Sequence, residues 1–319
     1  MSARVDDLSP PALSHAFAWM RGRRYENAPM AHYTSLRVGG TADLLLIPAD
    51  VDELRAIMTC ASAQALPLTW LGKGSNLIVR AGGIRGIVVS LREALSQLSL
   101  QTPSPEQKTH PSDPVHVRVG AGVPLTRVLH LSIRDGLKGL SFAVGIPGTL
   151  GGAVAMNAGT EVGAAWDVVE GVRLLLSNGE CVDVRPKDVA VGYRFAALPE
   201  HSVVLEATLR AERGDPIEVR EEVRQLYRCR RAQQPLAYPN AGSIFKNPPG
   251  ERAGRLIDQL GLKGYRIGDA QVSIKHANFI VNRGQAAVLD VLALIEEVKH
   301  QVYTHTGILL EEEVRIVGE

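Results

Sequence analysis

The 319-residue sequence has only three cysteines, which lie far apart at Cys60, Cys181 and Cys229. No two of them form the C-x-x-C pair of a metal site, and an odd, scattered set does not indicate a disulfide framework. We therefore expect free thiols, no bound metal and a cytoplasmic location. Long hydrophobic runs are also missing, because no stretch approaches the roughly 18 uninterrupted apolar residues of a membrane-spanning helix.

The sequence has no excess of charge of either sign, with 35 lysines and arginines against 34 aspartates and glutamates. A net charge of +1 gives no global attraction to nucleic acid or to anionic membranes, so neither partner is expected. The N-terminus carries Asp6 and Asp7 and lacks the apolar core of a signal peptide. The hydrophobic fraction of 45% and the charged fraction of 22% are those of an ordinary globular protein.

The pattern of apolar residues predicts an α+β chain. Short apolar runs predict strands at 44–48, 66–71, 77–79, 87–91, 115–119, 168–176, 181–184, 203–210 and 308–317. Apolar residues at helical spacing predict helices at 12–20, from Asp50 onward, at 124–134, 218–233 and 288–303. The polar, proline-rich stretch 101–114 is expected to be a loop. Regular alternation of strand and helix is missing, which argues against a parallel α/β sheet.

The length suffices for two domains, and the composition changes near Gly214-Asp215-Pro216. We therefore expect a boundary in this region. The expected parts are a lead-in at 1–29, a first domain at 30–212 with subdomains at about 30–92 and 93–212, and a second domain at 213–319.

A first glycine-rich segment, 72–77, has the sequence GKGSNL and follows an apolar strand. Leu77 stands where the dinucleotide fingerprint GxGxxG needs its third glycine, and the residues that follow favour a strand over a helix. A Walker loop is absent as well. Two interpretations remain. Successive N–H groups can form a nest for a phosphate, with Ser75 and Asn76 as additional donors, or the segment is a tight turn between strands.

A second glycine-rich segment, 145–152, has the sequence GIPGTLGG and small apolar neighbours. A flexible linker would be polar and would lack such neighbours. The segment indicates either a rigid backbone surface that a flat or phosphate-bearing ligand approaches closely, or a buried turn. Two such segments in one chain favour a ligand that carries a diphosphate.

A third polar cluster, 240–248, has the sequence NAGSIFKNP and contains Ser243. It is not the nucleophile elbow GxSxG, because residue 245 is phenylalanine. A serine hydroxyl near a positive charge can donate a proton to a carbanion, and Lys246 is the nearest such charge in sequence. The alternative is a turn serine with a structural role. His276, in the polar stretch 271–279, is likewise either a catalytic base or a structural histidine.

Three consecutive glutamates occupy 311–313 near the C-terminus. In a strand, side chains alternate between faces, so Glu311 and Glu313 would share one face and Glu312 would take the other. One of the three can therefore point into a site, and the alternation leaves open which one.

Six motifs follow one another in a fixed order: TSLRVGG at 34–40, GKGSNL at 72–77, GIPGTLGGA at 145–153, GYR at 192–194, GSIFKNP at 242–248 and LEEEV at 310–314. In this order the chain resembles the family of UDP-N-acetylenolpyruvoylglucosamine reductases over roughly residues 30–318. Each motif is weak alone, but six with matching spacing are specific. Only 35 residues separate Arg194 from Arg230, which is similar to the shorter type of the family, without the extra tyrosine loop.

The resemblance implies an α+β fold with an FAD-binding domain of the vanillyl-alcohol oxidase and p-cresol methylhydroxylase type, followed by a smaller α+β substrate-binding domain. It implies that NADPH reduces a non-covalently bound FAD. The flavin then reduces UDP-N-acetylglucosamine enolpyruvate to UDP-N-acetylmuramate for peptidoglycan synthesis. A cytoplasmic monomer is expected.

The resemblance also implies roles for individual residues. Arg194 would polarise the carboxylate of the substrate, Ser243 would donate the proton, and Glu313 would assist activation, since hydride addition to an enol ether is difficult without preorganised charge. FAD binding is expected at Gly72, Lys73, Gly74, Ser75, Asn76, Leu77, Gly145, Ile146, Pro147, Gly148, Thr149, Gly151 and Gly152, and at Arg37, for which a structural role is the alternative. Substrate binding is expected at Tyr193, Arg230, Lys246, Asn247, Gln271 and His276, with Arg230, Arg231 and Lys246 as candidates for the diphosphate.

Two other functions are compatible with such a fold. The first is a flavin-dependent alcohol or sugar oxidase. Many such oxidases attach FAD through a histidine or cysteine near the first glycine segment, and neither residue occurs between Trp70 and Ile87. The second is a flavin-binding protein without activity, which the presence of Arg194, Ser243 and Glu313 disfavours.

Overall fold

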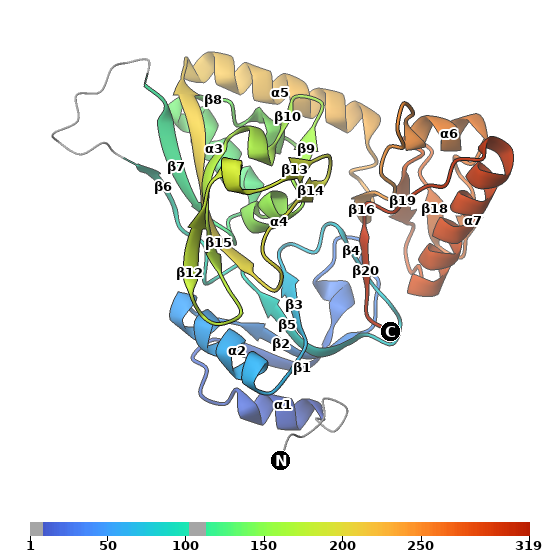
Figure 1. The fold of residues 1–319 in the computed structure, drawn as a ribbon. Helices are drawn as coiled ribbons and strands as arrows, with labels where there is room; N and C mark the ends of the chain where they lie inside the picture. The colour runs from blue at the N-terminus through green and yellow to red at the C-terminus, as the bar shows by residue number, and fades with distance from the viewer. Residues whose placement is uncertain (1–8, 102–112) are drawn as a thin grey trace. The chain divides into compact units, whose positions relative to one another are not determined.

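The computed structural model describes residues 9–101 and 113–319 (Figure 1). Most of the loop predicted at 101–114 therefore lies outside the described residues. Backbone contacts divide the chain into two compact units, each built from separate stretches of sequence. The first unit contains the described residues up to Arg24, Leu46–Gly72 and Val88–Arg228, and the second contains Tyr25–Leu45, Lys73–Ile87 and Cys229–Glu319. The predicted domain ranges, which are continuous, remain predictions.

The chain mixes helices and many short strands, as the α+β prediction requires. The helices are α1 (Pro10–Ala16), α2 (Val51–Ala63), α3 (Leu125–Asp135), α4 (Leu150–Ala155), α5 (Pro216–Gln233), α6 (Ala253–Gln259) and α7 (Val288–Thr306). The strands are β1 (Arg23–Pro29), β2 (Thr41–Ile47), β3 (Leu68–Leu71), β4 (Leu77–Val79), β5 (Ile84–Ser90), β6 (Leu98–Gln101), β7 (Val115–Gly120), β8 (Leu137–Lys138), β9 (Gly159–Thr160), β10 (Gly163–Ala164), β11 (Val169–Leu175), β12 (Cys181–Val184), β13 (Val191–Gly192), β14 (Phe195–Ala196), β15 (Val203–Arg213), β16 (Asn240–Ser243), β17 (Arg266–Ile267), β18 (Ala270–Val272), β19 (Phe279–Asn282) and β20 (Arg315–Val317). Among the described helices, none is long and apolar enough to cross a membrane.

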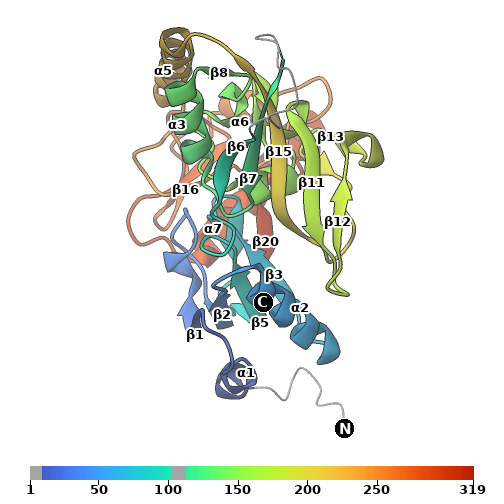
Figure 2. The ribbon, with the colours of Figure 1, turned by 90° about the vertical axis from the view of Figure 1, so that its left-hand side faces the viewer.

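The first unit is organised around an antiparallel sheet with the strand order β12-β11-β15-β7-β6, and β8 pairs with the end of β15. Figure 2 shows these strands side by side. Alternate side chains of β15, such as Leu205, Ala207 and Leu209, are buried, because α4 packs on this strand. The sheet therefore holds α4, and the glycine-rich segment that leads into it, against a rigid base.

Local sequence signals account for the ends of several elements. Asp50 caps α2 by accepting a hydrogen bond from the N–H of Glu53 at 2.9 Å, as expected for an N-cap aspartate. The helix predicted at 124–134 is α3, and it ends at Gly136 in the left-handed conformation (φ 62°). The predicted hairpin between β11 and β12 is confirmed as well, with Gly179 in its turn at φ 85°.

The second unit contains a four-stranded antiparallel sheet with the order β16-β19-β18-β17, and a parallel pair of β4 with β20. The long helix α7 buries one face in the core of this unit. Its side chains Val291, Ile295 and Val298 belong to the same apolar cluster as Ile244 and Phe245. The segment that contains Ser243 therefore continues directly into the core, which fixes its position.

The prediction of one strand over 308–317 was wrong in its first part. Only β20 is regular, and before it Glu312 forms a single bridge with Phe245. The N–H groups of Glu313 and Val314 both donate to the carbonyl of Ile244, at 2.7 and 3.4 Å, which interrupts a strand ladder. The argument from strand alternation therefore does not apply to the three glutamates.

Candidate functional site

In the first unit, Gly72, the first residue of the first glycine-rich segment, lies against the second segment. A Cβ at Gly72 would lie 2.6 Å from Oγ1 of Thr149, so no larger residue fits there without a shift. A Cβ at Gly151 would lie 2.7 Å from that of Ala121. These two glycines thus allow close packing, which places the start of the first segment beside Thr149 of the second.

The second segment is anchored through its neighbours. The N–H of Leu125 donates to the carbonyl of Gly148 at 3.1 Å, and the N–H of Gly151 donates to the carbonyl of Ala121 at 2.9 Å. Within residues 9–101 and 113–319, the N–H groups of Gly148 and Thr149 have no backbone acceptor. A fixed backbone with N–H groups left to donate suits an anionic ligand, so these residues fit a diphosphate.

The rest of the first segment belongs to the second unit and has the same character. Gly74 adopts φ 65°, and its carbonyl accepts a hydrogen bond from the N–H of Ser35 at 3.1 Å. The N–H groups of Lys73, Gly74 and Ser75 donate to no backbone carbonyl in the described part of the chain. The segment is a turn between β3 and β4, and its N–H groups fit a phosphate, so its binding of the FAD diphosphate remains a prediction.

Arg37 has an unusual backbone conformation, with φ 60°. Its neighbour Leu36 is fixed by the buried Asn282, whose Nδ2 donates to the Leu36 carbonyl at 3.2 Å. The Arg37 side chain is exposed, and among the described residues no ion-pair partner lies next to it. This arrangement leaves the guanidinium available to a ligand, and its contact with the flavin remains a prediction.

Arg194 lies in a two-residue turn of the first unit. Tyr193 and Arg194 connect β13 to β14, whose register pairs Gly192 with Phe195. Arg194 adopts φ 57°, a left-handed conformation that costs an L-residue about 1–2 kcal/mol. Its guanidinium carbon lies 5.1 Å from the centre of the Tyr193 ring. The turn thus presents a cation and an aromatic ring together. Binding of the substrate by Arg194 and Tyr193 remains a prediction.

The structure brings Ser243 and Glu313 together in the second unit. Ser243 ends β16, and the next residue, Ile244, accepts the hydrogen bond from the N–H of Glu313 at 2.7 Å. The side-chain Nδ2 of Asn76 donates to the carbonyl of Glu313 at 3.0 Å. In the part of the chain that the structure describes, the Ser243 hydroxyl makes no hydrogen bond. A serine hydroxyl without a hydrogen bond, close in the backbone to a fixed glutamate, is compatible with the roles predicted for Ser243 and Glu313.

The three glutamates differ in how they are held. Glu311 forms an ion pair with Lys246 at 3.2 Å, and Glu312 forms one with Lys299 at 2.7 Å. Glu313 is instead fixed through both ends of its backbone, as described above. The structure thus distinguishes the three glutamates by their contacts, and the role of Glu313 in the reaction remains a prediction. It also shows that Lys246 is engaged with Glu311.

Lys299 and Glu312 stabilise each other. Partial burial is the largest single influence on Glu312 and opposes its negative charge. The hydrogen bond from Lys299, a backbone hydrogen bond and the charges of Lys299 and Lys246 together outweigh burial, so the pKa of Glu312 lies below its ordinary value. The hydrogen bond that Lys299 donates to Glu312 likewise raises the pKa of Lys299. Because a carboxylate with a lowered pKa stabilises the folded state only while it is ionised, this contribution is present above the ordinary glutamate pKa and is lost as the pH falls through the folded value.

Replacing Lys299 by methionine is therefore expected to lower the free energy of unfolding by about 1 kcal/mol at neutral pH, the upper range for a partly exposed ion pair. Urea unfolding of wild type and variant, measured at neutral pH and at a pH below the folded pKa of Glu312, checks this. The difference should shrink at low pH, and Lys299→Arg should retain most of the stability. An equal difference at both pH values would contradict the assignment.

Most of the residues predicted to bind substrate lie in the second unit and have structural contacts there. Asn247 accepts a hydrogen bond from the N–H of Ala253 at 3.1 Å, at the start of α6. Gln271 donates to the carbonyl of Gly264 at 3.0 Å, and Arg230 donates to Gln234 at 3.3 Å. These contacts hold the side chains in place, and their binding of substrate stays a prediction.

His276 is largely packed inside the second unit. Its Nδ1 accepts a hydrogen bond from the N–H of Asn278 at 3.2 Å, and its ring meets that of Phe279 edge-on at 4.8 Å. Burial, followed by the nearby charge of Lys263, lowers the pKa of His276 below its ordinary value. The lowered pKa favours the neutral ring at pH 7. These contacts give His276 a structural role, and its binding of substrate stays a prediction.

Two buried asparagines that hold the site were not predicted. Asn278 is 4% exposed, and its amide accepts from the N–H of Phe245 at 3.0 Å and donates to the Phe245 carbonyl at 2.8 Å. It thus fixes the backbone directly after Ser243 and Ile244. Asn157 plays a similar part in the first unit and is considered below. The only signal in the sequence was an asparagine next to apolar residues, which does not reveal its partner.

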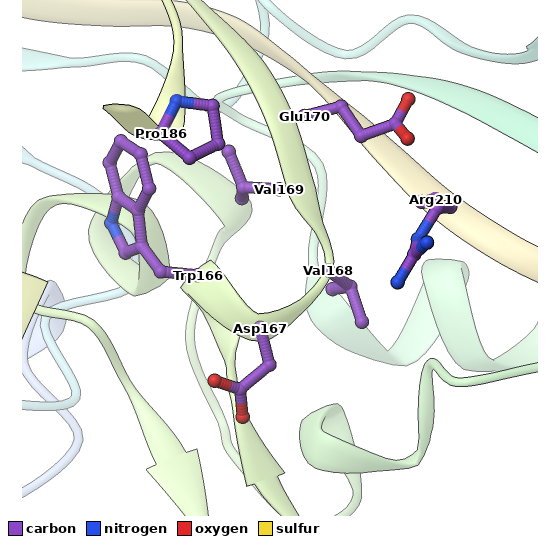
Figure 3. A pocket seen from close by; sticks show the side chains of 7 residues that line it. All are labelled: Trp166, Asp167, Val168, Val169, Glu170, Pro186 and Arg210. Atoms are coloured by element: carbon purple, nitrogen blue, oxygen red, sulfur yellow. The ribbon is translucent and has the colours of Figure 1, made fainter. Parts of the chain in front are cut away.

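A hollow with a volume of about 510 Å³ lies in the first unit, and none of the predicted site residues lines it (Figure 3). Figure 3 shows Trp166 beside Pro186 at one side and Glu170 with Arg210 at the other. Glu170 is paired with His116 at 2.6 Å. The hollow is open to solvent, so the glycine segments and Ser243 are better candidates for a site. Among the described residues, no group of acidic, histidine or cysteine side chains could hold a metal ion, and all three cysteines are free.

Comparisons with known proteins identify families for both parts of the chain. Residues 42–185 match the family described as FAD binding domain, and residues 234–317 match the C-terminal domain of UDP-N-acetylenolpyruvoylglucosamine reductase. These matches support FAD as the cofactor. They also confirm the predicted order of an FAD-binding part followed by a part specific to the reductase.

Full-length relatives extend the match over nearly the whole chain. UDP-N-acetylenolpyruvoylglucosamine reductase of Thiobacillus denitrificans is 43% identical over 94% of both chains, and that of Geobacter metallireducens is 44% identical over 95% of this chain and 96% of its own. The crystal structure of the reductase from Thermus caldophilus has a TM-score of 0.75 at 35% identity and covers 94% of this chain and 100% of its own. At this identity and coverage, the chain belongs to the family of UDP-N-acetylenolpyruvoylglucosamine reductases, flavin-dependent oxidoreductases of peptidoglycan precursor synthesis.

Proposed function

We propose that the chain reduces UDP-N-acetylglucosamine enolpyruvate to UDP-N-acetylmuramate, with FAD as redox cofactor and NADPH as reductant. The observation that carries the proposal is the hydrogen bond from the N–H of Glu313 to the Ile244 carbonyl at 2.7 Å. It fixes the backbone of Glu313 to the residue that directly follows Ser243, the proposed proton donor. Family membership supports the same reaction.

FAD, which the N–H groups of the two glycine-rich segments would hold, would supply transfer of a hydride from NADPH to the methylene carbon of the enolpyruvyl group. The residues of the chain stabilise the charge that forms and supply the proton. Addition of hydride turns the methylene into a methyl group and pushes an electron pair onto the adjacent carbon, which carries the ether oxygen and the carboxylate. Arg194 stabilises this charge by binding the carboxylate. Ser243 then gives its hydroxyl proton to the same carbon, which completes the lactyl ether.

Glu313 and the glycine segments have supporting roles in this proposal. The fixed backbone of Glu313 places its carboxylate for substrate activation, and the N–H groups of Gly148 and Thr149 hold a diphosphate. Lys246 and Arg230 remain the proposed ligands of the substrate diphosphate. Lys246 would have to exchange its partner Glu311 for the phosphate, which is feasible because that ion pair is exposed.

The reaction itself can be tested with purified protein loaded with FAD. Consumption of NADPH should depend on the enolpyruvyl substrate, and mass spectrometry should find a product heavier by two hydrogen atoms. Consumption of NADPH that depends only on oxygen, with unchanged substrate, would contradict the proposal. That outcome would instead support the oxidase alternative, which no observation on the chain itself favours.

We expect FAD to be bound without a covalent link, because no histidine or cysteine occurs between Trp70 and Ile87. Precipitation of the yellow protein with acid should leave essentially all flavin in the supernatant, and flavin absorbance in the washed pellet would refute this. The free Cys60, Cys181 and Cys229 support the proposed cytoplasmic location. The expectations of a monomer that binds neither nucleic acid nor membranes remain predictions.

A further inference from the structure

The turn that carries Arg194 is short and lies at the surface. The strands β13 and β14 that flank it have two residues each, and so short a hairpin is not stable alone. Apolar packing adds little stability, because the side chains of Val191, Tyr193 and Phe195 are 40%, 55% and 53% exposed. A hydrogen bond from another element to the backbone of this hairpin therefore helps to fix its position.

Asn157 supplies that contact. It follows α4, is 8% exposed, and its Nδ2 donates to the carbonyl of Gly192 at 2.9 Å. Gly192 is separated from Arg194 by Tyr193 alone, and it pairs with Phe195 on the other side of the turn. The hydrogen bond therefore fixes the base of the turn to the end of α4, which itself packs against β14 (Figure 1).

The orientation of the Asn157 amide is fixed as well. Its Oδ1 accepts a hydrogen bond from the N–H of Trp166 at 3.2 Å. Exchanging the amide oxygen and nitrogen would place two donors against each other at Trp166 and two acceptors at Gly192, so only the observed orientation satisfies both neighbours. Trp166 is in turn held by its Nε1, which donates to the carbonyl of Val154 within α4 at 2.9 Å.

These contacts connect two parts of the proposed machinery. The second glycine segment runs directly into α4 and then into Asn157, whose backbone is also left-handed at φ 47°, a conformation that asparagine tolerates better than most residues. We propose that Asn157 is a positioning residue, which sets Arg194 relative to the glycine segment through its hydrogen bond to Gly192. The proposal rests on the role of Arg194 in the proposed function.

Two variants separate positioning from folding. Asn157→Asp keeps the acceptor for Trp166 but turns the donor toward Gly192 into an acceptor. A carboxyl buried at this place has a raised pKa, and its protonated form can again donate to Gly192. Asn157→Gly tolerates the left-handed backbone and removes both hydrogen bonds. Asn178→Asp is the matched control, because Asn178 lies in the exposed turn between β11 and β12 and bonds only to Glu180.

The experiment measures, by rapid mixing without oxygen, the reduction of the flavin by NADPH and its reoxidation by the enolpyruvyl substrate. For Asn157→Asp at about pH 8 we expect reoxidation at least about tenfold slower than in wild type, with reduction within about twofold. The ratio to wild type should recover toward about pH 6, whereas Asn157→Gly should be slow at every pH. Asn178→Asp should match wild type throughout.

Substrate binding to the oxidised protein gives a second readout, followed by the change in flavin absorbance. Its Kd should rise in both Asn157 variants, because Arg194 binds the substrate carboxylate. The inference is overturned if both variants reoxidise and bind like wild type, or if reduction and reoxidation fall by the same factor. A wild-type flavin that the substrate does not reoxidise at all would overturn the proposed function and this inference with it.

Discussion

Ser243→Ala is expected to slow reoxidation of the reduced flavin by the enolpyruvyl substrate by about 10²–10⁴-fold, the range of general acid catalysis. Ser243 stands at the end of β16, and no described residue engages its hydroxyl, so the variant loses a proton donor without losing a structural hydrogen bond. Reduction of the flavin by NADPH does not need this proton and should be unchanged. Single-turnover absorbance of the flavin measures both steps separately.

A matched control is Ser202→Ala, because Ser202 lies in an exposed turn of the first unit and its hydroxyl bonds only to Pro199. This variant should reoxidise like wild type. If Ser243→Ala reoxidised at the wild-type rate, another group would have to supply the proton. The assignment of Ser243 would then be wrong even if the overall reaction were correct.

Glu313→Gln is expected to lower the rate of reoxidation by about 10²–10³-fold, the usual loss when one preorganised electrostatic group is removed. The substitution keeps the size of the side chain and leaves the backbone hydrogen bonds to Ile244 and Asn76 in place. The backbone position of residue 313 should therefore be kept, and the loss should appear in the rate of the reoxidation step. Stopped-flow reoxidation measures it, with flavin reduction by NADPH in the same preparation as the internal reference.

The neighbouring glutamate provides the control for this variant. Glu311→Gln removes the same charge two positions away, where the carboxylate is exposed and pairs with Lys246. An exposed ion pair contributes about 0–1 kcal/mol, so its reoxidation rate should stay within about fivefold of wild type. Equal losses in both variants would show that total charge matters and not the position of Glu313.

Elements with strong local signals could be predicted from the sequence alone. The capping aspartate before α2 and the glycine that ends α3 determine where these helices begin and end, because both effects act within one turn of chain. The hairpin of β11 and β12 was equally local. By contrast, β20 is much shorter than the strand predicted at 308–317, since Ile244, a residue distant in sequence, takes the N–H groups of Glu313 and Val314.

Some features of the candidate site could likewise be predicted from the sequence, and others could not. Glycine-rich segments are visible in a sequence because glycine is needed where a backbone approaches closely, as at Gly72. The ion pairs of Glu311 with Lys246 and of Glu312 with Lys299 were not visible, because these lysines are distant in sequence or lie on another element. Asn157 and Asn278 were missed for a related reason: an asparagine whose amide binds a distant backbone looks the same in sequence as one in a turn.

The most direct test of the central claim is a titration without oxygen. The protein is loaded with FAD, its absorption spectrum is recorded, and one equivalent of NADPH is added, followed by UDP-N-acetylglucosamine enolpyruvate. The account predicts that the flavin band bleaches with NADPH and returns in full with the substrate. A band that bleaches and returns only when oxygen is admitted would contradict it.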